Sequence, residues 1–350
     1  MLIVRPRMLA WLAAAASALA LAACGSSSSN RPSSVKITPS AQTAAKAASG
    51  TGPRIFVVGG EANDPFWSRV KRGADDAAKL VEAEGGSVTW LGPQNYNNLG
   101  PDAAKLLQTA VAQRASGVVG PDWVPQAEDA AFKKITAAHI PLIIDNAGGL
   151  QAANNVGAVN YVGTDELYAG KAGGAYFGRH GVKHVLCVNT LPGTANAEAR
   201  CHGIGLGIAS TGGKSTELPL PSSQFGNPTA VAQGVKAALL RDSSIDGVVT
   251  ISTGDADSAA SAIQQGNLQS KVKLGTFDLD PSQLQRIKSS QQLFAIDQQP
   301  YMQGFLAVSM LNEHIKWGLD LPQRPILTGP AIIDSANVNP VLAGANAGVR

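Results

Sequence analysis

Carboxylates, amides, one arginine and two adjacent aromatic residues occur in short segments that follow β-branched runs of the chain. The segments are EANDPFW (61–67), DNAG (145–148), NTLPGTANAEARCHG (189–203), TGDADS (253–258), TFDLD (276–280) and AIDQQPYMQG (295–304). A sugar or polyol presents many hydroxyl groups, and each hydroxyl both donates and accepts hydrogen bonds. Carboxylates, amides and a guanidinium match those hydroxyls, and an aromatic ring suits the C–H face of a sugar ring. The pattern favours a site for a sugar or polyol.

These segments need a scaffold, and the β-branched runs provide one because they alternate with helical stretches. The runs lie at 55–58, 87–91, 117–119 and 141–145, and then at 161–163, 184–188, 247–251, 273–277 and 293–296. After the first run, Val70, Ala74, Ala77 and Val81 recur with the spacing of a helix packed on a sheet. We therefore expect an α/β protein with two doubly wound parallel sheets, and ligands bind such sheets beyond the carboxyl ends of their strands.

Length and composition agree with two lobes. Nearly 300 residues follow position 53, which suits two ordinary domains. Charged residues make up 15% of the chain, against about 25% in an average soluble protein. The net charge is +3 and no basic run is present, so we expect no nucleic-acid partner.

The sequence argues against common catalytic sites. It contains neither a G-x-S-x-G elbow nor an H-E-x-x-H pair. The stretch 212–215 (GGKS) resembles part of a phosphate loop, but Ile208 stands where the first glycine of that loop is required. Paired carboxylates would suit a glycosidase, yet sugar binding needs the same groups. We expect no catalytic residue, no cofactor and no metal.

The N-terminus has the pattern of a bacterial lipoprotein signal. Arg5 and Arg7 precede an apolar run at 8–21, which is too short to span a bilayer and ends at the sequence LAAC with Cys24. We expect residues 1–23 to be a signal peptide and Cys24 to carry the lipid, whose acyl chains hold a protein on a membrane.

The next segment, 24–52, is rich in serine, threonine, alanine and proline and has no apolar periodicity. Such a sequence cannot bury enough surface to fold, so we expect a flexible tether that reaches roughly 30 Å. The protein would then be extracytoplasmic and lipid-anchored to the bacterial cell membrane.

Two further cysteines, Cys187 and Cys201, are separated by one strand-to-helix turn. In an exported protein they most simply form a disulfide, because that compartment is oxidising. The alternative is a metal site that adds His184 and His202. It is less favoured because adjacent helical residues such as Cys201 and His202 point about 100° apart.

The strand-end motifs make the chain resemble a known family. The pieces DPFWSRVKRGADDAA, VGTDELYAGKAGG, GTANAEARCHG, GTFDLD and FAIDQQPYMQG occur in the order and spacing found in the periplasmic sugar-binding proteins of ABC importers, specifically the ribose-binding-like type I group. The resemblance implies two lobes that are joined by three crossovers and close on a ligand like a hinge. It also implies a permease partner with a separate ATPase, and we expect a monomer.

The resemblance further implies where the lobes divide. The crossovers would lie near 163–166, 297–300 and 327–330. The N-terminal lobe would then comprise 53–164 and 299–329, and the C-terminal lobe 165–298 and 330–350.

The resemblance also implies which residues contact the ligand, at the positions that match the family's motifs. Phe66 and Trp67 would stack on the ligand and Asp64 would bond its hydroxyls; the other polar contacts would be Asp145, Asn146, Arg200, Asp255, Asp278 and Gln298. Structural alternatives exist for most of these. The two aromatic residues suit a core, Asp145 and Asp278 suit helix caps, and Arg200 suits a surface ion pair.

Departures from the ribose-type pattern bear on the ligand. Asp64 and Asp255 replace asparagines of that type, and Asn146 replaces an arginine. If all these groups line the pocket, four carboxylates face one guanidinium, which suits a donor-rich ligand and disfavours phosphates and sugar acids. We therefore expect a neutral monosaccharide or a sugar alcohol, and an amine-bearing ligand is also compatible.

Three functions follow, in order of preference. The first is a lipid-anchored receptor for carbohydrate import, and the second is a sensor that passes its ligand signal to a chemoreceptor or sensor kinase. The third is a carbohydrate-active enzyme. A cytoplasmic repressor is disfavoured by the export signal and by the lack of a helix-turn-helix pattern.

Overall fold

A computed structural model describes residues 52–322 and 324–350. The expected signal peptide, the lipidation site Cys24 and nearly all of the expected tether lie outside these residues. Within the described ranges, none of the helices combines the length and the apolar character needed to cross a membrane.

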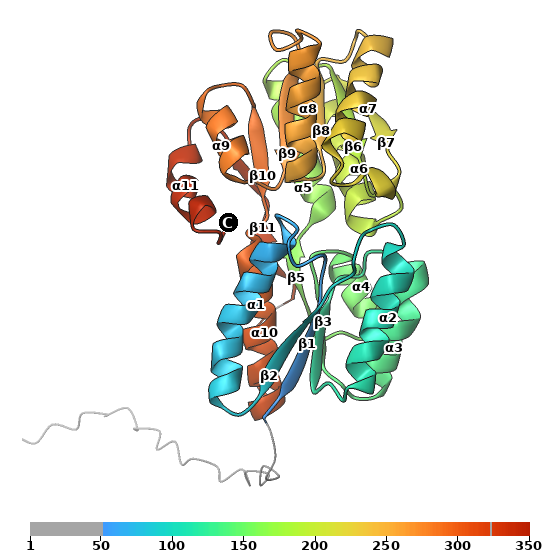
Figure 1. The fold of residues 1–350 in the computed structure, drawn as a ribbon, viewed down its shortest axis with the longest axis vertical. Coiled ribbons are helices and arrows are strands. Elements are labelled where there is room, and N and C mark those ends of the chain that lie inside the picture. The colour runs from blue at the N-terminus through green and yellow to red at the C-terminus, as the bar shows by residue number, and fades with distance from the viewer. Residues whose placement is uncertain (1–51, 323) are drawn as a thin grey trace, which may run out of the picture. The chain divides into compact units, whose positions relative to one another are not determined.

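The described chain alternates strands and helices and forms two six-stranded sheets (Figure 1). The strands are β1 (Arg54–Val58), β2 (Ser87–Leu91), β3 (Gly117–Gly120), β4 (Leu142–Asp145), β5 (Asn160–Thr164), β6 (His184–Asn189), β7 (Lys214–Pro219), β8 (Gly247–Thr250), β9 (Lys273–Phe277), β10 (Phe294–Asp297), β11 (Ile326–Gly329) and β12 (Ala331–Ile333). The helices are α1 (Trp67–Ala83), α2 (Leu99–Ala112), α3 (Pro125–Ala137), α4 (Gly149–Val156), α5 (Glu166–Arg179), α6 (Ala195–Ala209), η1 (Ser222–Gln224), α7 (Pro228–Arg241), α8 (Thr253–Gln265), α9 (Pro281–Lys288), α10 (Pro300–Trp317) and α11 (Val338–Asn346).

The sheet of the N-terminal lobe has the order β11-β5-β4-β3-β1-β2, and all its strands are parallel. Alternate side chains of β1 point to opposite faces. Ile55 and Val57 pack with α1 and α10, whereas Phe56 and Val58 pack with α2 and α3. The predicted apolar stripe of α1 is fully buried against this sheet, which confirms that helix.

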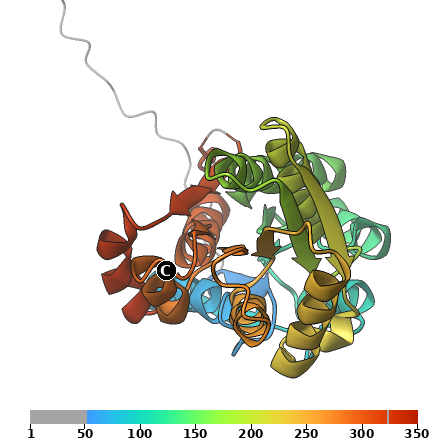
Figure 2. The ribbon, with the colours of Figure 1, turned by 90° about the horizontal axis from the view of Figure 1, so that it is seen from above.

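The sheet of the C-terminal lobe has the order β12-β10-β9-β8-β6-β7. All its pairings are parallel except that of β12 with β10. Val185 and Cys187 of β6 pack with α5 and α6, whereas Leu186 and Val188 pack with α7 and α8. Figure 2 shows this lobe from above, with helices on both faces of its sheet.

Three crossovers join the lobes. The chain leaves the first sheet after β5, returns from the second sheet after β10, and passes over once more between β11 and β12. The prediction of two doubly wound lobes with a three-crossover hinge is therefore confirmed.

Three strands were not among the β-branched runs expected from the sequence: β7, β11 and β12. β7, with the sequence KSTELP, lies at the edge of the second sheet, and its side chains are exposed or half-buried. An edge strand needs no apolar face, so its sequence lacks the pattern on which strand prediction depends.

Cys187 and Cys201 form a disulfide with an S–S distance of 1.98 Å. The bond joins β6 to α6, and both cysteines are buried in the core between α5, α6 and the sheet. His184 is not a partner of the two sulfur atoms, because its ring nitrogens form hydrogen bonds with the hydroxyls of Ser244 and Thr216. The sulfurs are bonded to each other and are therefore not available as thiolate ligands.

We predict that a Cys187→Ala/Cys201→Ala variant is less stable than the parent. The bond closes a loop with a sequence separation of 14 residues, which corresponds to about 3 kcal/mol in the loop-entropy account. The melting temperature should fall by roughly 6–12 °C for lobes of this size, as differential scanning calorimetry would measure. A reductant should lower the parent's melting temperature similarly and leave the variant unchanged. Equal melting temperatures for parent and variant would contradict this role.

Candidate functional site

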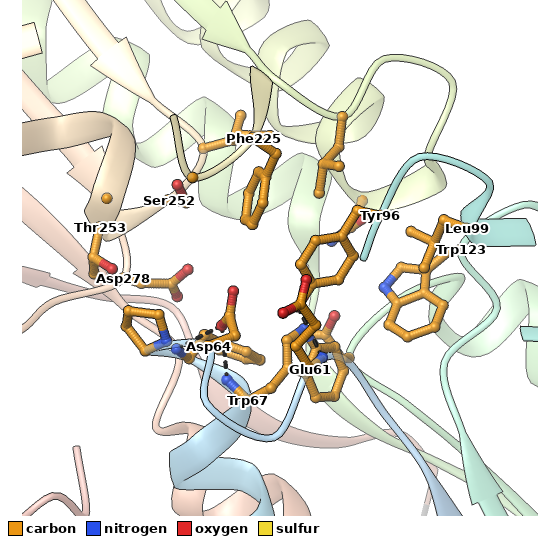
Figure 3. A pocket seen from close by; sticks show the side chains of 18 of the residues that line it. Glu61, Asp64, Trp67, Tyr96, Leu99, Trp123, Phe225, Ser252, Thr253 and Asp278 are labelled. Atoms are coloured by element: carbon orange, nitrogen blue, oxygen red, sulfur yellow. Dashed lines mark hydrogen bonds between the residues drawn. The ribbon is translucent and has the colours of Figure 1, made fainter. Parts of the chain in front are cut away.

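A cavity of about 450 Å³ lies between the two lobes. This volume is in the range of small-molecule sites. Each lobe contributes half of its wall, mostly from loops that follow strands. The wall residues are Glu61, Asn63, Asp64, Pro65, Phe66, Trp67, Tyr96, Leu99, Trp123 and Asn146 of the N-terminal lobe, and Leu191, Asn196, Arg200, Phe225, Gly226, Ile251, Ser252, Thr253, Gly254 and Asp278 of the C-terminal lobe. Figure 3 shows most of these side chains around the open space.

Asp64 is held in place by the start of α1. Its Oδ1 accepts hydrogen bonds from the backbone N–H groups of Phe66 (2.8 Å) and Trp67 (3.0 Å). These bonds satisfy N–H groups that have no partner within the helix. Burial raises the pKa of Asp64, although these hydrogen bonds, the Tyr96 hydroxyl and Arg69 oppose the shift. Asp64 therefore combines a fixed position with a carboxylate that is poorly solvated.

Five aromatic side chains contribute to the wall: Phe66, Trp67, Tyr96, Trp123 and Phe225. The Trp67 ring lies edge-on to Phe66 at 5.2 Å and to Trp123 at 5.4 Å between ring centroids. Only 6% of Trp67 is exposed, and it belongs to a core cluster of the N-terminal lobe. Trp67 therefore belongs to the core, as its structural alternative expected, and it also lines the cavity, whereas Phe66 is only half-buried.

Two contacts connect the lobes directly beside the cavity. The Tyr96 and Phe225 rings meet edge-on across the lobes with their centroids 4.8 Å apart. The Ala195 N–H donates to the Trp123 carbonyl at 2.7 Å. Because Ala195 is the first residue of α6, this carbonyl satisfies an N–H that lacks a partner within the helix. The lobes are therefore in contact on this side of the site.

Arg200 reaches the cavity from α6, and its charge is already balanced. Its Nε and Nη2 donate to the two carboxylate oxygens of Glu166, each at 2.8 Å, and Nη1 donates to the Ile251 carbonyl at 2.9 Å. Only 4% of Arg200 and 7% of Glu166 are exposed. The alternative of a surface ion pair is therefore wrong, because the pair is buried. Sequence reasoning missed Glu166, which lies 34 positions away at the start of α5.

Asp278 follows β9 and adopts a left-handed backbone with φ of 64°. Its Oδ1 accepts a hydrogen bond from Gln298 Nε2. Burial raises its pKa to about 7, although Arg200 and Gln298 oppose the shift. It does not cap the following helix, because Asp280 caps α9 with a complete capping box.

Three expected site residues lie behind the wall rather than in it. Asp145 is fully buried, and neither of its carboxylate oxygens has a hydrogen-bond partner in residues 52–322 and 324–350. It caps no helix, since Gly148 precedes α4. Asp255 is buried and is not part of the cavity wall, and its carboxylate accepts hydrogen bonds from the hydroxyls of Thr190 and Ser252.

Gln298 is also fully buried, and it reaches the site only through Asp278. The expectation of four carboxylates facing one guanidinium is therefore corrected. The cavity wall has three carboxyl groups, Glu61, Asp64 and Asp278, and the Arg200 guanidinium is shared with Glu166.

Several wall residues were not chosen from the sequence. Glu61, Asn196 and Thr253 lie inside segments that the strand-end pattern selected, but no single-residue signal distinguished them. Tyr96 and Trp123 follow β2 and β3, so the strand-end pattern could have found them.

We predict that Glu166→Gln lowers the free energy of unfolding by about 3–5 kcal/mol, because it leaves the buried Arg200 guanidinium without its counter-charge. A Glu166→Leu/Arg200→Met variant should recover most of that loss, since a buried pair replaced by apolar groups leaves no charge behind. Urea unfolding measures both effects.

The matched control is Asp75→Ala, which breaks the exposed pair with Lys71 and should cost at most about 1 kcal/mol. A Glu166→Gln variant as stable as the Asp75→Ala control would refute the structural role of the buried pair.

Comparison with known proteins places this fold and cavity in a family. Residues 55–319 match the family model described as periplasmic binding protein domain. A xylose/arabinose-binding protein, XylF of Sulfolobus acidocaldarius, is 23% identical over 307 residues, which cover 83% of this chain and 73% of that protein.

Solved structures give the same result. A carbohydrate transporter from Acidothermus cellulolyticus 11B, in complex with myo-inositol, is 30% identical with a TM-score of 0.77, covering 86% of this chain and 100% of that one. The glucose-galactose binding protein GanP of Geobacillus stearothermophilus shares the fold at 20% identity, with a TM-score of 0.72 and coverage of 82% and 99%. Members of this family bind ligands rather than convert them, so the chain is a binding protein and not an enzyme. With the two lobes, the three crossovers and the cavity between them, the chain belongs to the periplasmic binding protein domain family.

Proposed function

We propose that the protein is the lipid-anchored substrate-binding component of an ABC importer, and that it captures a neutral monosaccharide or sugar alcohol between its lobes. The observation that carries the proposal is the cavity itself. It is enclosed by the carboxyl-end loops of both sheets and combines hydrogen-bonding groups with aromatic faces. Hinge closure would surround such a ligand with donors and acceptors from both lobes, after which the permease would receive it.

The charges of the wall support a ligand without an acidic group. A phosphate or carboxylate in the cavity would meet the three carboxyl groups Glu61, Asp64 and Asp278. Arg200 would not compensate, because Glu166 already accepts from two of its nitrogens. Hydroxyl groups, by contrast, donate well to carboxylates and accept from the remaining guanidinium hydrogens.

The relatives support the same ligand class. The related Sulfolobus protein is described as binding xylose and arabinose, and the Acidothermus structure contains myo-inositol, a cyclic polyol. Both are small, uncharged and rich in hydroxyls. They support a monosaccharide or a cyclitol as the ligand of this chain.

Anchoring and location are part of the proposal. Family membership supports an extracytoplasmic position. The sequence pattern around Cys24 supports a lipid anchor after removal of residues 1–23. Two acyl chains or more would keep the receptor beside its permease.

A sensor that signals to a chemoreceptor or sensor kinase is the alternative, and it would use the same capture step with a different membrane partner. Uptake of the radiolabelled ligand by cells that lack the gene separates the two. Loss of uptake supports the importer, and normal uptake supports the sensor.

We predict that a monosaccharide or sugar alcohol stabilises the purified protein against heat. A ligand at 100 times its dissociation constant adds about 2.7 kcal/mol, which raises the melting temperature by several degrees. A thermal-shift panel of pentoses, hexoses, their alcohols and cyclitols measures this effect, with sugar phosphates and sugar acids as the anionic controls. If no ligand of the panel raised the melting temperature, or if only the anionic sugars did, the proposal would be contradicted.

We also predict different consequences for the two adjacent aromatic residues. Phe66→Ala should weaken ligand binding about tenfold, because it removes stacking area from a half-buried ring. Its cost in stability should be within about 1 kcal/mol. Trp67→Ala should weaken binding and also destabilise the fold by about 3–5 kcal/mol, because it empties a core position.

Calorimetric titration and urea unfolding of each variant test this pair of predictions. Phe305→Ala is the control, since Phe305 stacks on Tyr301 away from the cavity. Unchanged affinity in Phe66→Ala would remove Phe66 from the ligand site.

A further inference from the structure

Three carboxyl groups share one part of the cavity. Glu61 and Asp64 belong to the loop after β1, and Asp278 belongs to the loop after β9 in the other lobe. Figure 3 shows all three carboxyl groups directed into the open space between the lobes. A neutral ligand would leave these groups to repel one another once they ionise.

Counter-charge in the wall is scarce. Arg200 is the one basic residue among the described wall residues, and Glu166 holds it through two hydrogen bonds. Arg69 lies outside the wall, beside a smaller neighbouring cavity, and its Nη1 donates to the Pro65 carbonyl. Arg69 and Arg200 oppose the rise in the pKa of Asp64 and Asp278, respectively, and Arg350 beside the same smaller cavity pairs with Asp297. Because these guanidinium groups are engaged with other acceptors, the three carboxyl groups are only partly compensated.

Asn196 adds an independent sign that a donor is missing. It lines the cavity, 9% of it is exposed, and its Oδ1 has no hydrogen-bond partner in the described part of the chain. A buried acceptor without a partner costs free energy. An ammonium group only donates, and it would meet acceptors here on both lobes.

The aromatic wall also suits a cation. Phe66, Trp67, Tyr96, Trp123 and Phe225 surround the same space. The faces of aromatic rings carry partial negative charge and attract ammonium groups, most strongly where water is excluded. Carboxylates and aromatic faces together recognise an organic cation better than a simple polyol.

We propose that Glu61, Asp64 and Asp278 form an ammonium subsite, so that the cavity also takes amino-substituted sugars and cyclitols and binds them more tightly than their neutral parents. This inference rests on the proposed function and extends its ligand class. The hydroxyls would use the remaining wall groups, and the amino group would lie among the three carboxylates.

The protonation of these carboxyl groups agrees with this geometry. Burial raises the pKa values of Glu61 and Asp64, and it raises that of Asp278 to about 7. The charged groups that face Asp278 are Arg200, Glu166 and Asp64, and Arg69, Asp297 and Arg350 line a smaller neighbouring cavity with it. Asp64 also faces Arg69 and Glu61. A bound cation favours the ionised carboxylates and lowers their pKa values. Binding of an amine should therefore release protons, and binding of a neutral polyol should not.

The test compares matched ligands by isothermal titration calorimetry at pH 6.5, where an amine with the pKa of an α-amino group is mostly charged. The neutral sugars and cyclitols are titrated first, and then the amino and N-acetylamino derivatives of each. Two buffers with different ionisation enthalpies report the proton release. We expect at least one amino derivative to bind tenfold or more tightly than its neutral parent, with proton release, and its uncharged N-acetyl form to lose that gain.

Variants locate the subsite. Glu61→Gln and Asp64→Asn keep the shape and remove one charge each, so the ratio of neutral to amine dissociation constants should fall from tenfold or more to about threefold or less. Asp75→Asn removes an exposed charge of α1 that is remote from the cavity wall, and it should leave the ratio unchanged.

The outcomes separate the two proposals. Binding of neutral parents with no gain for the amines overturns the ammonium subsite and leaves the proposed function intact. An amine gain that survives both Glu61→Gln and Asp64→Asn also overturns the subsite. No binding by any sugar, cyclitol or amine overturns the proposed function and this inference together.

Discussion

The structure depends on one geometric constraint: the carboxyl ends of two parallel sheets face each other across three crossovers. A parallel sheet exposes its connecting loops at that edge, where the side chains after each strand gather. Here the loops after β1, β2 and β3 meet those after β6, β8 and β9 around one cavity. Because the connections pass beside the cavity, a small rotation at the crossovers would open or close the whole site.

Within this arrangement, the buried Glu166–Arg200 ion pair reduces the positive charge that the cavity wall presents to a ligand. Glu166 begins α5 directly after the first crossover, and Arg200 comes from α6. The two helices approach closely because Gly170 and Gly203 pack against each other's backbone, where a Cβ would find atoms within 2.4 Å. Glu166 therefore holds Arg200, the one guanidinium of the described cavity wall, in a structural contact. In the proposed function, the carboxyl groups Glu61, Asp64 and Asp278 of the wall then select the ligand.

The sequence was sufficient for the fold and for part of the site. All nine β-branched runs became strands, β1–β6 and β8–β10, because buried strands carry a regular apolar pattern. The three crossovers were expected from the family resemblance and not from periodicity. The sequence selected Asp64, Phe66, Asn146, Arg200 and Asp278, all of which line the cavity. It could not distinguish Asp255, which turns toward Thr190, from Asp278, which faces the cavity. Nor could it find Glu166 or Phe225. Glu166 meets Arg200 only because α5 packs against α6, and Phe225 follows the edge strand β7, whose sequence has no apolar pattern.

The most direct test of the account is the distance between the lobes with and without ligand. Asn97 and Asn227 are exposed positions next to the Tyr96–Phe225 contact, one on each lobe. Spin labels at these two positions measure the distance between the lobes by pulsed electron paramagnetic resonance. If the cavity captures its ligand by closure, the best polyol of the panel should shift a broad or long distance distribution to a single short one. A distribution that the bound ligand leaves unchanged would contradict capture between moving lobes.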